Sequence, residues 1–107
     1  MDSRDAMARY ERIRELTRQM LAAAQQSDWD SLIAVEAQRK AVVETVTLPD
    51  IDFAASGLMS VKDACINEIL EMDAQIRGLT ETWMGEMREM LSTVQSQRKL
   101  ERTYNSG

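Results

Sequence analysis

The stretch INEILEMDAQIRGLTETWMGEMREMLSTV, residues 66–94, decides the fold of this chain. Its apolar side chains recur at alternating steps of three and four residues, which is the period of an amphipathic helix. The pattern continues with almost no interruption over about residues 58–96, a range that contains no proline. At 1.5 Å per residue, a helix from Ser60 to Ser96 is roughly 55 Å long. The sequence therefore predicts one long amphipathic helix in the second half of the chain.

Two shorter helices are predicted before it. The first covers about residues 3–26, with apolar side chains on one face and charges of mixed sign on the other. The second covers about residues 28–46, and Ser27, three residues before Asp30, resembles a capping box at its start. Residues 47–57, which include the only proline, end the second helix and form a loop. The same rise per residue makes these two helices only about 36 Å and 28 Å long.

Together these elements predict an all-α fold with a single domain over residues 1–107. The short joint at Ser27 forces the first two helices into an antiparallel hairpin. The predicted architecture is an antiparallel three-helix bundle, or coiled-coil hairpin, with a long third helix over 58–96 and a short C-terminal tail helix within residues 97–107. Four residues of the second helix are expected to have structural roles: Trp29, Leu32, Glu36 and Arg39.

Trp29 and Arg39 carry the most specific of these structural predictions. The helix lengths place Trp29 beside Ile76–Thr80 of the third helix, where the indole is expected to pack. Arg39 interrupts the apolar face of the second helix and has two candidate partners, Glu36 one turn before it or Asp73 across the bundle. Asp73 lies on the apolar face of the third helix, where a polar group is costly unless it is paired. It therefore either sets the register inside the bundle or contacts a partner.

Because the third helix is longer than the first two, part of its apolar face has no partner within the predicted bundle. An unpartnered apolar surface is usually a place where another chain binds. Flexible methionine side chains suit a surface that accepts a partner helix, although an ordinary core role for them remains the alternative. The residues predicted to bind a partner are Asp73, Ile76, Leu79, Thr80, Trp83, Met84, Met87, Met90 and Leu91.

Composition argues against most other functional classes. The 107 residues include no histidine, which rules out serine-type triads and histidine-ligated metal sites, and no glycine-rich phosphate loop is present. An enzyme is not expected, and no cofactor is predicted. The net charge of −5 argues against direct nucleic-acid binding by phosphate neutralisation, and no run approaches the ~20 apolar residues of a membrane span. The single Cys65 and the lack of a signal peptide indicate a cytosolic protein.

Three stretches resemble the FliT-type flagellar export chaperones. ERIRELTRQMLAAAQQSDWDSLIAVEAQRKAVVETV, residues 11–46, is similar to the opening hairpin of that family, with Trp29, Asp30, Leu32 and Glu36 at matching positions. ILEMDAQIRGL, residues 69–79, resembles the third helix of the family. QSQRKLERTY, residues 95–104, resembles its last segment, a basic run that ends in a tyrosine, here Tyr104. The resemblance spans nearly the whole chain and rests on the order and spacing of the three stretches.

The resemblance implies a bacterial cytosolic chaperone that binds the C-terminal helical segment of the filament-capping protein and prevents its premature assembly. Delivery to the flagellar type III export apparatus would pass through the export ATPase complex and the export gate, with Tyr104 docking at the gate. The resemblance also implies that some members bind and inhibit the master transcription activator of flagellar genes. The alternatives are a helical adaptor or assembly protein, a dedicated regulator, and a chaperone of another secreted subunit. A homodimer is left open.

Overall fold

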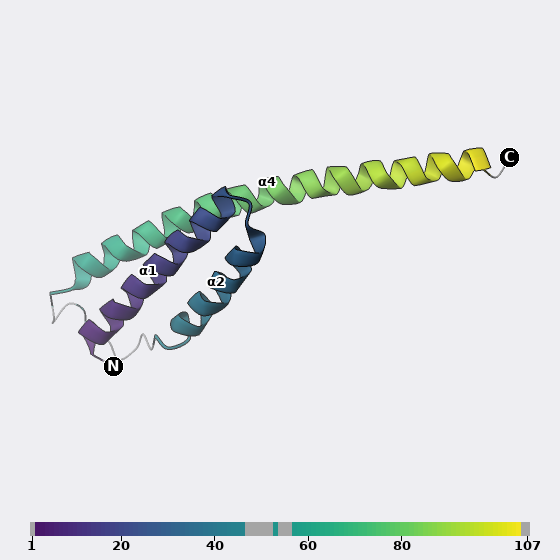
Figure 1. Ribbon diagram of the computed structural model, residues 1–107. Coiled ribbons are helices and arrows are strands. Elements are labelled where there is room, and N and C mark those ends of the chain that lie inside the picture. Colours follow the sequence, from purple (N-terminus) through teal and green to yellow (C-terminus); the bar gives the residue numbers. More distant parts are fainter. Residues whose placement is uncertain (1, 47–52, 54–56, 106–107) are drawn as a thin grey trace. The chain divides into compact units, whose positions relative to one another are not determined.

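Figure 1 shows the computed structural model, which describes residues 2–46, Phe53 and 57–105, with the side chains of the last three outside the description. The described residues form three helices and no strand, which confirms the all-α class. The helices are α1 (Ser3–Gln25), α2 (Trp29–Val43) and α4 (Met59–Asn105). Among these described helices, none has both the length and the hydrophobicity of a transmembrane segment. Most of the predicted loop at 47–57 lies outside the described residues.

The chain divides into two compact units, and the single domain over residues 1–107 stays a prediction. Unit 1 is residues 1–77 and unit 2 is residues 78–107. Unit 1 contains α1, α2 and the first part of α4, and unit 2 contains the remainder of α4. The helix continues without a break through residues 97–105, where the sequence predicted a separate tail helix. The reason is local, because residues 95–102 contain neither glycine nor proline and are rich in good helix formers.

The joint between α1 and α2 differs from the predicted capping box. Ser27 has a left-handed backbone with φ of 55°, and the N–H groups of Ser27 and Asp28 donate to the carbonyls of Ala24 and Ala23. This pattern closes the C-terminus of a helix, so Ser27 ends α1 instead of starting α2. Asp28 is the N-cap of α2, because its carboxylate accepts hydrogen bonds from the hydroxyl (2.7 Å) and the N–H (3.2 Å) of Ser31. Those bonds lower the pKa of Asp28 below its ordinary value.

The core of unit 1 is built on α1. Buried α1 residues recur at the helical period along its whole length, namely Ala6, Met7, Tyr10, Ile13, Leu16, Thr17, Met20 and Ala24. By contrast, α2 buries Leu32 alone among its residues, and α4 buries Cys65, Ile69 and Ile76 within unit 1. The described part of unit 1 therefore uses α1 as its central element, with one face of each other helix directed at it.

Tyr10 and Cys65 mark the point where α1 meets α4. The Tyr10 ring lies 6.0 Å from the Phe53 ring, at an interplanar angle of 57°. The Cys65 thiol donates to the Tyr10 carbonyl across 3.5 Å. Burial raises the pKa of the Cys65 thiol and of the Tyr10 hydroxyl above their ordinary values. Cys65 is accordingly a protonated core side chain and not a nucleophile.

Candidate functional site

A polar network inside unit 1 links its three helices. Arg39 of α2 donates from Nη1 to Asp73 Oδ1 of α4 across 2.6 Å and to Thr17 Oγ1 of α1 across 3.2 Å. Thr17 is fully buried, and its hydroxyl donates to the Ile13 carbonyl at 2.7 Å. Arg39 and Asp73 keep only 20% and 29% of their side-chain surface exposed. Charge-assisted hydrogen bonds of this kind are stronger than exposed surface ion pairs, so the network orients α2 against its neighbours.

The network decides between the two partners considered for Arg39. The structure has the pair with Asp73, while Glu36 is exposed on the surface of α2. Asp73, predicted to bind a partner, is therefore already engaged within unit 1. Ile76, one turn later on α4, is buried, so its predicted contact with a partner would first require that the side chain be uncovered. Trp29 is half-buried, and Leu32 is buried in the core.

Sequence reasoning missed two further ties between helices. Arg9 of α1 donates from Nη1 to the Thr45 carbonyl at 2.7 Å, which satisfies a backbone group just beyond the end of α2. Glu68 of α4 lies 3.7 Å from Arg14 and 3.4 Å from Arg18, where the sequence showed only charges of mixed sign on one face of the first helix. Exposed ion pairs such as these contribute little stability each, so their main effect is on the alignment of α1 with α4.

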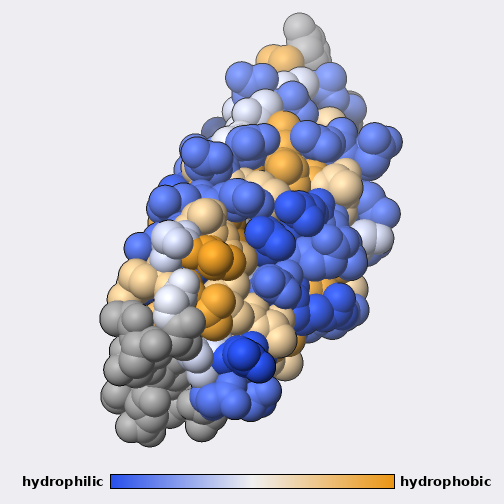
Figure 2. Space-filling view, turned by 90° about the vertical axis from the view of Figure 1, so that its left-hand side faces the viewer, coloured by the Kyte–Doolittle hydropathy of each residue, from blue (hydrophilic) through white to orange (hydrophobic). Residues whose placement is uncertain are grey.

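An apolar groove on unit 1 was also missed. The groove has a volume of about 350 Å³. Its lining residues come from α1, from the end of α2 and the segment that follows it, and from the first part of α4. Val43 and Leu70, on its α2 and α4 sides, are both exposed. Figure 2 shows apolar atoms reaching the surface between hydrophilic ones. The lining residues are Tyr10, Ile13, Val43, Val46, Ile66, Ile69 and Leu70. The valines at the end of the second helix were the available signal for an apolar surface there. Periodicity alone, however, does not show that two apolar helix faces leave a groove between them.

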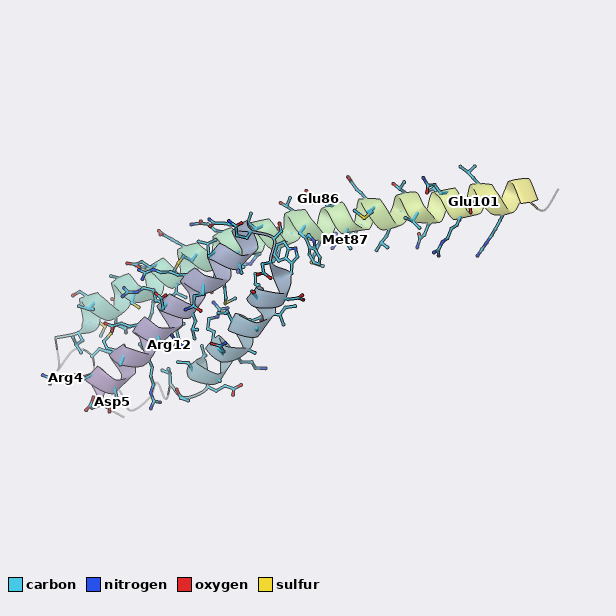
Figure 3. The ribbon with its side chains drawn as sticks, viewed as in Figure 1. Arg4, Asp5, Arg12, Glu86, Met87 and Glu101 are labelled. Atoms are coloured by element: carbon cyan, nitrogen blue, oxygen red, sulfur yellow. The ribbon has the colours of Figure 1, made fainter. Side chains whose placement is uncertain are left out.

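Unit 2 carries the exposed apolar surface that the sequence predicted. None of the described side chains from 78 to 102 is buried. Leu79 and Thr80 are half-buried, and Met87 is among the side chains that project from α4 in Figure 3. Six apolar residues, at steps of one and three along the chain, share a face of the helix. We call them the unit-2 stripe: Trp83, Met84, Met87, Met90, Leu91 and Val94, all exposed.

Basic residues follow the unit-2 stripe along α4. Gln95, Arg98, Lys99 and Arg102 line a shallow pocket of about 210 Å³. The backbone of Tyr104 belongs to α4, but its side chain lies outside the described residues. Within the part of the chain that the structure describes, no group of three or more acidic or cysteine side chains is placed to hold a metal ion. The described residues of unit 2 thus offer an exposed apolar stripe followed by a basic segment.

Comparisons with known proteins point to a single family. A family model described as flagellar protein FliT matches residues 7–106 of this chain. Curated proteins named flagellar protein FliT, from Yersinia pseudotuberculosis serotype O:3 (strain YPIII) and serotype IB (strain PB1/+), are each 27% identical over 99 residues. In both cases the match covers 92% of this chain and 82% of the relative. No solved structure matches the chain significantly.

Proposed function

Because this chain belongs to the FliT family of flagellar proteins, we propose that it is a cytosolic export chaperone for the filament-capping protein. It binds the C-terminal helical segment of that protein, prevents its premature assembly and delivers it to the flagellar type III export apparatus. The observation that carries this proposal is the unit-2 stripe, an exposed apolar surface on a chain of a flagellar family. The proposed partner-binding residues are those of the stripe together with Leu79 and Thr80.

The physics of the unit-2 stripe suits a helical cargo. A cap-protein segment that assembles later has an apolar face, and that face aggregates when it is left in water. An amphipathic helix buries such a face against apolar residues spaced three and four apart, without ATP and without covalent chemistry. Met84, Met87 and Met90 adapt their shape to the cargo because their side chains are unbranched and polarizable. An acidic group beside the stripe, Glu86, favours cargo with basic flanks and speeds the encounter.

The supporting role of unit 1 follows from its contacts. We propose that its three helices form an antiparallel bundle. Arg9, early in α1, meets Thr45 after the end of α2, whereas Thr17, further along α1, meets Arg39 earlier in α2. In an antiparallel pair of helices, a later residue on one helix contacts an earlier residue on the other, and these two contacts follow that order. Such a bundle holds the first part of α4 rigidly.

A direct binding experiment tests the proposed function. We expect the purified full-length chain to form a saturable complex with a fluorescent peptide of the cap protein's C-terminal helical segment, measured by fluorescence polarization. A scrambled peptide of the same composition is the control, since it keeps the charge but loses the amphipathic period. Equal binding of both peptides, or of neither, would contradict the proposal. A permanent complex that does not exchange with free peptide would favour a structural adaptor instead.

Tyr104 is proposed to dock the complex at the export gate. We expect Tyr104→Ala to leave helical content and cap-peptide binding within about twofold of the wild type, because the described side chains that precede it on α4, residues 95–102, are all exposed and lie outside the unit-2 stripe. Co-precipitation with the gate protein and swarming should both decrease. Tyr104→Phe is the matched control, and it should retain docking if the aromatic ring is the anchor. Normal docking and swarming of the alanine variant would remove Tyr104 from the proposed site.

The export ATPase complex is the other proposed partner on the delivery route, and the flagellar master transcription activator is proposed as a regulatory partner. Co-purification from motile cells separates these possibilities. Recovery of the cap protein and the ATPase complex supports the chaperone. Recovery of the transcription activator without any export substrate would support a dedicated regulator.

A further inference from the structure

We propose that Met84, Met87 and Met90 form an oxidation-sensitive modification site, at which peroxides convert the thioethers to sulfoxides and thereby weaken cargo binding. The inference rests on the proposed function, because it concerns the regulation of the same surface. These three methionines are part of the unit-2 stripe and lie three residues apart along α4. Cargo binding by these methionines does not itself require any oxidation or reduction of their sulfur atoms.

Exposure separates the methionines of this chain into distinct classes. Met84, Met87 and Met90 keep 47%, 36% and 61% of their surface exposed, whereas Met7 and Met20 in the core keep 5% and 3%. Susceptibility of methionine to oxidation follows its exposure to solvent. The three stripe methionines should therefore react well ahead of the two core methionines. Met59 is also exposed, at 41%, but it lies at the start of α4 in unit 1 and outside the stripe. It therefore serves as a control for oxidation of an exposed methionine that is not part of the proposed cargo surface.

The chemical step is a two-electron oxygen transfer. The methionine sulfur attacks one oxygen of hydrogen peroxide, the O–O bond breaks, and that oxygen becomes the sulfoxide oxygen. The other oxygen takes up the proton left behind and leaves as water, so the sulfur is oxidised and the peroxide is reduced. Methionine sulfoxide reductases reverse the step, with one enzyme type for each sulfoxide epimer.

The product changes the surface that the cargo would cover. A sulfoxide is polar and chiral, and its oxygen is a strong acceptor that needs a hydrogen-bond donor when it is buried. An apolar cargo face offers none, so we expect cap-peptide affinity to fall by about tenfold or more when the three residues are oxidised. The helix itself should persist, because the three methionine side chains are exposed and lose no core packing when they are oxidised. Space around the helix is also open at Gly85, where an added Cβ would have no side chain or other segment within 4 Å.

The test combines oxidation mapping with binding. The full-length chain is treated with dilute hydrogen peroxide, and peptide mass spectrometry follows each methionine while circular dichroism follows helical content. We expect Met59, Met84, Met87 and Met90 to oxidise first, helical content to be retained and cap-peptide binding to fall. Incubation with both types of sulfoxide reductase should restore binding. Preferential oxidation of Met7 and Met20, or full binding after the stripe methionines are oxidised, would overturn the inference.

Two variants assign the effect to the stripe. Met84→Leu combined with Met87→Leu and Met90→Leu removes the reactive sulfur from the unit-2 stripe, so the affinity of this variant for the cap peptide, whatever its starting value, should be the same before and after peroxide. Met59→Leu should remain as sensitive as the wild type. A triple variant whose affinity for the peptide falls after peroxide as much as that of the wild type would overturn the inference and leave the proposed function intact. Absence of peptide binding by the reduced wild type would instead overturn the proposed function, and this inference with it.

Discussion

Replacement of Met87 and Met90 by aspartate in one double variant is expected to reduce binding of the cap-protein segment by at least about a hundredfold, without loss of helical content. Both side chains are exposed on α4, so the fold has little packing to lose. In the complex, however, the two carboxylates would face an apolar cargo helix. An unpaired charge in an apolar interface costs several kcal/mol, and each 1.4 kcal/mol corresponds to a tenfold change in affinity.

Circular dichroism and a thermal melt check the fold of this variant, and fluorescence polarization with the cap peptide checks its binding. Ser92→Asp combined with Ser96→Asp is the matched control. It adds the same two negative charges to the same helix, but on the side away from the unit-2 stripe. Loss of helical content in the methionine variant would show that these residues are bundle core. Equal loss of binding in the serine variant would show that net charge, and not the stripe, governs the interaction.

The second large effect is expected at Leu16, which is fully buried near the middle of α1. Leu16→Ala should lower the free energy of unfolding by about 3–5 kcal/mol, because it removes buried methyl groups and leaves a cavity that the three helices cannot fully close. Urea unfolding followed by circular dichroism measures the change. A loss of this size is a large fraction of the about 5–15 kcal/mol by which a typical domain is stable.

Leu70→Ala is the matched control for Leu16→Ala, because it makes the same chemical change in the same unit. Leu70 is 59% exposed, so its truncation should cost less than about 1 kcal/mol. Similar destabilisation by both variants would contradict the burial pattern on which the central role of α1 rests. A larger effect at Leu70 would mean that the groove beside it is closed in solution.

Local patterns predicted the helices well because their causes are local. Apolar residues at the helical period and the lack of proline between 58 and 96 are enough to indicate that α4 is one long amphipathic helix. The candidate pair between Arg39 and Asp73 was also visible, since each charge interrupts an apolar face and needs a partner. The joint at Ser27 was misjudged because a left-handed C-terminal position usually carries glycine, and serine gives no such signal.

Periodicity shows which face of a helix is apolar, but not what covers that face. Ile76 and Met87 belong to the same apolar pattern, yet one is buried and the other is exposed. Trp29 was expected to pack beside Ile76–Thr80 and is half-buried, whereas Leu16 and Thr17 are completely buried. The sequence by itself determined the helices, the unit-2 stripe and the family resemblance. Only the tertiary structure decided which apolar residues become core, because burial depends on contacts between segments far apart in the chain, and those contacts also formed the groove between Tyr10 and Leu70.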